Sequence, residues 1–176
     1  FFLGQLADYI RLTHQEGVSP GKLKGSYAGA MGYGQFIPSS YLAYAVDFDD
    51  DGQRDIWTNP VDAIGSVANY FARHGWRAGD PIVADVLLEG TPKDDWVNDS
   101  LKPTLSVAEW RERGITADAS LSDEQLVTLM RMSSEEGDQY LLGLHNFYVI
   151  TRYNHSRLYA NAVRELSELI KAGIDT

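Results

Sequence analysis

Three aspartates at alternate positions form the clearest chemical pattern in the chain. Asp47, Asp49 and Asp51 occupy positions 1, 3 and 5 of the loop DFDDDGQRD. Gly52 and Gln53 follow at positions 6 and 7. These are the offsets of an EF-hand loop, in which alternate carboxylates converge, glycine allows the sharp turn, and the seventh residue offers its carbonyl. The spacing therefore predicts a structural Ca²⁺ site.

The loop needs a further acid, because Ca²⁺ takes about six to eight oxygen ligands. Thr58 stands where the usual closing glutamate would be, and the next candidate is Asp62, in the first turn of a predicted helix. We therefore expect Asp62 to close the site, with Asp55 as a candidate outer ligand. The alternative is a solvated acidic turn without a metal, in which the like charges repel one another.

A glycine-rich stretch, GAMGYGQFIPSSY, covers residues 29–41. It has neither the Lys-Ser/Thr pair of a phosphate-binding loop nor a GxGxxG pattern. Glycines allow a ligand close to the backbone, Gln35 can both donate and accept hydrogen bonds, and Tyr33 and Phe36 can stack on sugars. The mixture favours a hydroxyl-rich ligand over a nucleotide. The alternative is a tight corner between helices in which Gln35 caps backbone groups.

A second polar and aromatic cluster, TRYNHSRLY, covers residues 151–159. Tyr153, Asn154 and Tyr159 follow no apolar periodicity, although Asn154 has the alternative role of capping the last helix. Tyr70 taken alone is more typical of a core. Ser26 has no adjacent His and Asp, so a catalytic triad is not indicated.

The composition limits the class of protein. The chain has 176 residues and a net charge of −10, from 25 acidic and 15 basic residues. This charge disfavours binding to nucleic acid or to an anionic membrane surface. The absence of cysteine excludes disulfides and thiolate metal sites. No apolar run approaches the length of a transmembrane helix.

Apolar spacing and capping signals predict the elements that must position these residues. The predicted helices cover 1–15, 38–46, 60–75, 107–113 and 156–172. A strand is predicted over 81–90, and 126–132 fits either type. The pattern predicts a mainly α, α+β fold in three parts. These are a helical core (1–79) with the calcium loop 47–62, a small α+β subdomain (80–140), and a return to the core (141–176).

Four long segments stand out in order along the chain: LKGSYAGAMGYGQFIPSSY, AVDFDDDGQRDIW, NPVDAIGSVANYFARHGW and NFYVITRYNHSRLYANAV. Together they resemble the membrane-bound lytic transglycosylase B family. The resemblance implies a lysozyme-like core and structural Ca²⁺. It also implies an enzyme that cleaves the β-1,4 bond between MurNAc and GlcNAc in peptidoglycan strands, giving 1,6-anhydroMurNAc products.

The resemblance also implies roles for individual residues. Residues that match the sugar-binding site are Ser26, Gln35, Tyr70, Tyr153, Asn154 and Tyr159. Residues that match the calcium ligands are Asp47, Asp51, the Gln53 carbonyl and Asp62, with Asp49 in the place of a shorter oxygen ligand.

The catalytic acid of the family, a glutamate, lies well upstream of the position of Ser26. We therefore expect the general acid to lie N-terminal to Phe1, with no catalytic residue in this chain and the N-terminal part of the parent fold missing. Glu16 is a local rival, because its spacing to Gln35 is close to that in the related soluble lytic transglycosylases. We expect Glu16 to be solvated at a frayed helix end.

Other functions stay open at this point: a non-catalytic glycan-binding fragment, or a calcium-stabilised structural module. The resemblance implies a periplasmic protein, whose parent is a candidate outer-membrane lipoprotein. We expect a monomer that binds peptidoglycan and neither nucleic acid nor, through this chain, a membrane.

Overall fold

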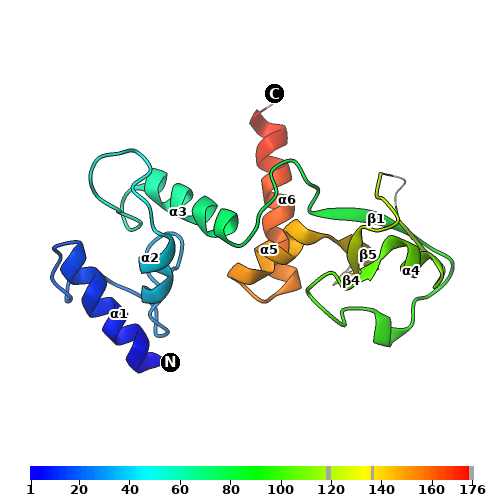
Figure 1. The fold of residues 1–176 in the computed structure, drawn as a ribbon, viewed down its shortest axis with the longest axis horizontal. Helices are drawn as coiled ribbons and strands as arrows, with labels where there is room; N and C mark the ends of the chain where they lie inside the picture. Colours follow the sequence, from blue (N-terminus) through cyan, green and yellow to red (C-terminus); the bar gives the residue numbers. More distant parts are fainter. Residues whose placement is uncertain (118–119, 136, 175–176) are drawn as a thin grey trace. The chain divides into compact units, whose positions relative to one another are not determined.

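The chain folds as two units, Phe1–His74 and Gly75–Thr176. The computed structural model describes residues 1–117, 120–135 and 137–174. Helices build the first unit, and an antiparallel sheet followed by two helices builds the second (Figure 1). The three functional parts expected from the sequence stay a prediction.

Three helices form the first unit: α1 (Phe2–Gln15), α2 (Pro38–Tyr44) and α3 (Pro60–Arg73). They confirm the helices predicted over 1–15, 38–46 and 60–75. Proline begins both α2 and α3, where its missing N–H costs no helical hydrogen bond. Asn59 caps α3 by accepting a hydrogen bond from the Val61 amide. Gly75 follows the end of α3 with a φ of 90°, as a C-terminal cap requires.

Reciprocal hydrogen bonds hold α1 against α2. The side-chain Nε2 of Gln5 donates to the Ser39 hydroxyl at 3.0 Å, and the Ser39 backbone amide donates to the side-chain Oε1 of Gln5 at 3.1 Å. The core of the unit comes from both helices and from the loops that follow them. Its buried side chains include Leu12, Met31, Phe36, Tyr41 and Ile56.

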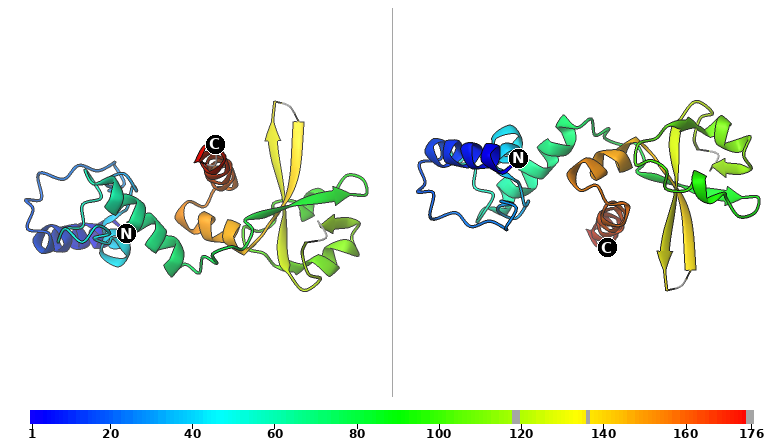
Figure 2. Two further views of the ribbon diagram at one scale, coloured as in Figure 1. Left: turned by 90° about the horizontal axis from the view of Figure 1, so that it is seen from above. Right: turned by 90° about the horizontal axis from the view of Figure 1, so that it is seen from below.

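A five-stranded antiparallel sheet in the order β2-β4-β5-β1-β3 begins the second unit. Its strands are β1 (Val83–Leu88), β2 (Leu105–Ser106), β3 (Ile115–Ala117), β4 (Leu126–Ser134) and β5 (Gly137–Gly143). The segment that fitted helix or strand, 126–132, is thus a strand. Figure 2 shows β4 and β5 as a long twisted hairpin.

A 3₁₀ turn, η1 (Asp94–Trp96), and a short helix, α4 (Val107–Arg111), lie within the sheet region. The capping box predicted for α4 is present: the Ser106 hydroxyl accepts from the Glu109 amide, and the Glu109 carboxylate accepts from the Ser106 amide. The core beneath the sheet consists of Val97, Val107, Trp110, Ile115, Val127, Leu129, Leu142 and Leu144.

Two helices close the second unit, α5 (His145–Tyr153) and α6 (Arg157–Ile174). The sequence analysis assigned no element to residues 145–153, and five of the nine residues of α5 are buried. The predicted last helix is confirmed as α6. Its apolar residues Leu158, Leu166, Leu169 and Ile170 are exposed in this structure. No described helix is long and apolar enough to cross a membrane.

Candidate functional site

The acidic loop brings three carboxylates together. Oxygens of Asp47, Asp49 and Asp62 all lie within 4.8 Å of one another. The backbone makes this possible at two positions with left-handed φ, 59° at Asp50 and 91° at Gly52. Three converging carboxylates are a donor set suited to a hard divalent cation.

Asp62 closes the loop from α3, as its position in the sequence predicted. Its side chain is fully buried. One carboxylate oxygen accepts from the Phe48 amide and the other from the Asp55 amide, both at 2.8 Å. Asp62 therefore ties both arms of the loop to the first turn of the helix.

The other predicted ligands lie differently. Asp51 is not in the carboxylate cluster, and its Oδ1 accepts from the Gln53 amide at 2.8 Å. Asp55 was a candidate outer ligand, and its carboxylate instead accepts from the backbone amides of Trp57 and Thr58. Burial raises the pKa of Asp55, but the hydrogen bonds from Thr58 and Trp57 outweigh burial and lower that pKa overall.

The glycine-rich stretch forms a tight corner. The Tyr33 amide donates to the Ile56 carbonyl at 2.9 Å. A Cβ on Gly32, whose φ is 64°, would lie 2.4 Å from that carbonyl oxygen. Gln35 has a φ of 50°, and its side chain donates to the Gly32 carbonyl at 2.9 Å. Glycine at position 32 therefore leaves room for the Ile56 carbonyl. Gln35 caps a backbone group, as the alternative interpretation of this stretch predicted.

Tyr70 lies in an aromatic stack next to this corner. Its ring is stacked on His74 with centroids 4.0 Å apart, and it contacts Tyr44 at 4.8 Å and Phe36 at 6.0 Å. Only 9% of Tyr70 is exposed. Since Phe36 follows Gln35 directly, the stack supports the backbone that carries the glutamine.

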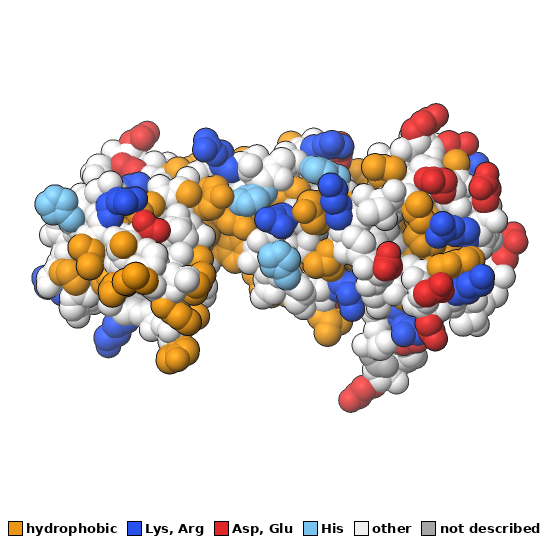
Figure 3. Space-filling model, turned by 60° about the horizontal axis from the view of Figure 1, so that its bottom comes forward, with side chains coloured by type: hydrophobic (Ala, Val, Ile, Leu, Met, Phe, Trp, Pro, Cys, Tyr) orange, Lys and Arg blue, Asp and Glu red, His pale blue; other side chains and the backbone are white. Residues whose placement is uncertain are grey.

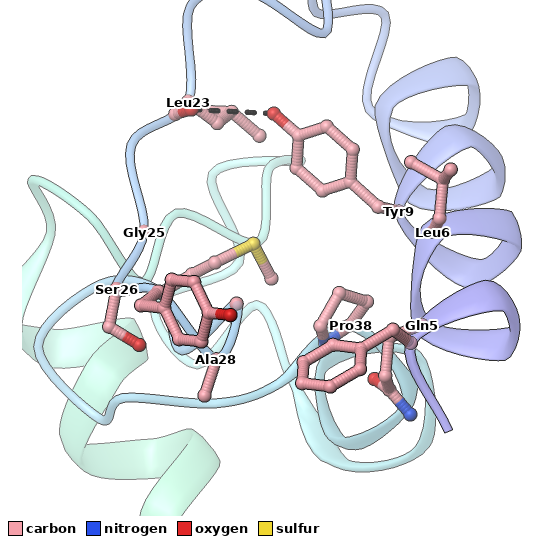
Figure 4. A pocket seen from close by; sticks show the side chains of 12 residues that line it. Gln5, Leu6, Tyr9, Leu23, Gly25, Ser26, Ala28 and Pro38 are labelled. Carbon is pink, nitrogen blue, oxygen red and sulfur yellow. Dashed lines mark hydrogen bonds between the residues drawn. The ribbon is translucent and has the colours of Figure 1, made fainter.

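Ser26 lines an apolar pocket of about 260 Å³ between α1 and the glycine-rich stretch (Figure 4). Its hydroxyl accepts from the Ala30 amide at 3.1 Å. Tyr9 of α1, which sequence reasoning did not single out, contributes to the same pocket and donates its hydroxyl to the Leu23 carbonyl at 3.3 Å. Nothing in the local sequence marks Tyr9, because the contact joins residues 14 positions apart.

Three predicted sugar-binding residues belong to the second unit. Tyr153 ends α5, Asn154 is the residue that follows its last turn, and Tyr159 lies in the first turn of α6 with 37% of its surface exposed. The cap of α6 is Ser156, whose hydroxyl accepts from the Tyr159 amide at 3.2 Å. Asn154 therefore does not cap the last helix.

Glu16 corrects one expectation from the sequence. It follows the last residue of α1, yet its side chain is only 17% exposed and forms an ion pair with Arg54. The expectation that Glu16 is solvated at a frayed helix end is thus wrong. The partner is 38 residues away, so helix patterning gave no sign of the pair. Arg54 also lies over the ring of Tyr41, at 5.3 Å from its centroid.

Helices around an acidic loop, followed by an antiparallel sheet, define a mixed α+β protein, and comparison with solved structures shows that the fold is lysozyme-like. Residues 1–168 match the family described as the transglycosylase SLT domain, and the chain belongs to this family.

Three proteins illustrate the relationship. Membrane-bound lytic murein transglycosylase B of Escherichia coli is 45% identical over 172 residues, which are 97% of this chain and 46% of that protein. Soluble lytic transglycosylase SltB1 of Pseudomonas aeruginosa has a TM-score of 0.93 and 46% identity, over 100% of this chain and 58% of that one. Slt35 of Escherichia coli, solved in complex with calcium, has a TM-score of 0.86 and 43% identity, over 98% and 54%. The chain thus spans about half the length of these relatives.

Proposed function

We propose that the chain forms part of a peptidoglycan lytic transglycosylase, which cleaves the β-1,4 bond between MurNAc and GlcNAc and releases 1,6-anhydroMurNAc products. The observation that carries the proposal is the 45% identity to a lytic murein transglycosylase over 97% of the chain. The family match over residues 1–168 supports it.

The reaction needs one protein carboxyl group, unlike the paired carboxylates of most glycoside hydrolases. A glutamic acid protonates the oxygen that leaves C1. The C6 hydroxyl of the same MurNAc then attacks C1 and gives its proton to the carboxylate left by the first step, so that no water enters the product. An apolar site keeps such a carboxyl group protonated and able to donate, because poor solvation raises its pKa.

Glu16 is not the acid in this proposal. Its carboxylate is held in an ion pair with Arg54, 38 residues away, and its side chain is only 17% exposed. We assign the role to a glutamate N-terminal to Phe1 in the longer protein. Replacing Glu16 with Gln should then leave turnover intact.

Each unit carries residues that we propose as sugar contacts. Gln35 and Ser26 offer polar groups beside the pocket and the corner of the first unit, and Tyr70 supports the backbone of Gln35. Tyr159 and Asn154 are exposed on the second unit, where an aromatic ring and an amide can contact sugar residues. Tyr153 completes the set of six residues that we propose as sugar contacts.

The acidic loop holds a structural Ca²⁺ in this proposal. The carboxylate cluster of Asp47, Asp49 and Asp62 supports it, and the relative Slt35 was solved in complex with calcium. Asp51 and the Gln53 carbonyl are proposed to complete the oxygen ligands. Bound Ca²⁺ would neutralise the converging charges and fix the loop.

A periplasmic site of action accompanies this function, since peptidoglycan lies there. The name of the E. coli relative describes a membrane-bound protein. The proposed partner is the glycan strand, and the proposed state is a monomer.

Product analysis tests the activity. The protein that carries this chain is incubated with purified sacculi, and the released muropeptides are analysed by mass spectrometry. We expect products lighter by one water than the hydrolytic ones, with the same yield from the Glu16→Gln variant. Products with reducing ends, or a Glu16→Gln variant that folds but does not turn over, would contradict the proposal. Binding of chitotetraose without any cleavage would favour the glycan-binding alternative.

A further inference from the structure

A basic pocket of about 410 Å³ lies in the second unit, outside the contacts proposed above. Arg131, Ser133 and Asn98 line it from the sheet region, and His155 and Arg157 line it from the turn between α5 and α6. Two guanidinium groups and an imidazole thus surround it. No carboxylate is among its lining residues in the described part of the chain.

Arg157 is the basic residue of the pocket whose guanidinium has no anionic partner among the described residues. It is half-buried, and among the described residues none forms an ion pair or a hydrogen bond with its side chain. Arg131, by contrast, has Asp94 at 3.4 Å and Asp138 at 3.8 Å. A guanidinium that has lost part of its hydration favours an anion that can accept two of its N–H groups.

The pocket contrasts with its surroundings. The whole chain carries a net charge of −10. Figure 3 shows acidic side chains gathered over the sheet end of the second unit, with Lys and Arg side chains among them. A pocket lined by bases in such a chain selects anionic groups by charge.

Hydrogen bonds fix the walls of the pocket before any ligand arrives. Asn98 has a left-handed φ of 61°. Its backbone N–H donates to the Leu129 carbonyl, and its side-chain Oδ1 accepts from the Arg131 backbone N–H, both at 3.0 Å. On the other side, the Ser156 hydroxyl holds the first turn of α6 through the Tyr159 amide. Preorganised walls reduce the entropy lost on binding.

We propose that this basic pocket binds a carboxylate of the peptide stem attached to the glycan strand. The inference rests on the proposed function, since it takes peptidoglycan as the ligand. His155 and Arg157 lie in the sequence between Asn154 and Tyr159, two of the proposed sugar contacts. A peptide leaving a sugar bound there therefore has a short path to the pocket. Peptide stems carry free carboxylates, which a guanidinium binds through paired hydrogen bonds.

Calorimetric titration of the chain with three ligands tests the inference. The ligands are a disaccharide-tetrapeptide with free stem carboxylates, the same compound with those carboxylates amidated, and chitotetraose. At low salt we expect the free acid to bind about fivefold more tightly than the amide, the effect of one partly solvated charge-assisted hydrogen-bonded pair. In Arg157→Gln this advantage should disappear while the affinity for the amide is unchanged, and Arg157→Lys should keep part of it.

Lys171→Gln is the matched control, because it also removes one positive charge from α6, at an exposed position far along the helix from the pocket. It should keep the full advantage of the free acid. Equal affinities for the free acid and the amide would overturn the inference, and so would tighter binding of the free acid that persists in Arg157→Gln. In either case, binding of chitotetraose would still support the proposed glycan-binding function. If none of the three ligands binds, the proposed function fails and the inference fails with it.

Discussion

At the scale of single residues, Asp62 does most to hold the acidic loop. Its two carboxylate oxygens accept from Phe48 and Asp55, which lie on opposite arms of the loop. The side chain is fully buried, so water cannot replace a partner that is lost. The same carboxylate belongs to the cluster with Asp47 and Asp49. Asp62 therefore links helix α3, the loop and the proposed cation.

Replacing Asp62 with Asn should destabilise the fold even without Ca²⁺. The amide group of Asn presents N–H groups to one of the two backbone donors, which costs about 1–3 kcal/mol for a buried unsatisfied donor. Urea unfolding in EDTA measures the loss. Asp50→Asn is the control, because Asp50 is exposed, is outside the cluster, and has a left-handed φ that Asn tolerates. Equal losses in the two variants would refute the role given to Asp62.

At the scale of elements, helix α3 and the acidic loop pack through a glycine. A Cβ on Gly65 would lie 2.4 Å from Cγ of Phe48. Phe48 stands between two members of the carboxylate cluster, Asp47 and Asp49. The close approach of helix and ring thus sets the position of the loop backbone, and only glycine allows it in the middle of α3.

Gly65→Ala should destabilise the protein and weaken its response to Ca²⁺. Alanine gains up to about 1 kcal/mol in helix propensity, but overpacking against Phe48 costs roughly 1–3 kcal/mol. Thermal unfolding with and without Ca²⁺ measures both effects. Gly4→Ala in α1 is the matched control, since nothing lies within 4 Å of its added Cβ, and it should not destabilise. A more stable Gly65→Ala variant would show that Phe48 moves aside freely.

The capping box of α4 predicts a pH dependence. The backbone and hydroxyl of Ser106 donate to Glu109 and lower the pKa of its carboxyl group. A depressed pKa in the folded state means that the stabilisation is complete above the ordinary pKa of glutamate and is lost as pH falls through the folded value. Glu109→Ala should therefore be less stable than the wild type at pH 7, and this difference should shrink in acid. Urea unfolding across pH 7 to about pH 3 measures it, and a constant difference would count against the capping role.

At the scale of the whole molecule, negative charge is the dominant feature. The chain has 25 acidic and 15 basic residues, and three of the acids converge in one loop. A divalent cation reduces repulsion at this point without altering any packing. Since the cluster is formed in the folded state, Ca²⁺ that binds there stabilises folding by mass action.

Removing Ca²⁺ should lower the melting temperature, and adding it back should restore the original value. At a free concentration of about 100 times Kd, the added stability is about 2.7 kcal/mol. Differential scanning calorimetry in EDTA and then in excess Ca²⁺ measures the change. Mg²⁺ at the same concentration is the control, because it prefers a smaller octahedral site and should restore less. A melting temperature that does not respond to Ca²⁺ would rule out the cation at this loop.

The local features of this protein follow from the order of its residues alone. The offsets of Asp47 and Asp49, the prolines that begin α2 and α3, and the capping box of α4 depend on neighbours within a few residues, so spacing alone predicts them. Asp62 was also within reach, because it lies in the first turn of the helix next to the loop. Family resemblance supplied the fold and the set of sugar-binding residues, whose roles stay a proposal.

Features that depend on contacts between distant parts of the chain are visible only once the chain is folded. Glu16 meets Arg54 over a separation of 38 residues. Gly32 is needed because the Ile56 carbonyl reaches it, and Arg157 shares a pocket with Arg131. None of these pairs has a periodic or capping signal, because each partner is selected by how loops and strands pack rather than by local backbone preference. Long-range packing thus determines the surroundings of Glu16, Gly32 and Arg157.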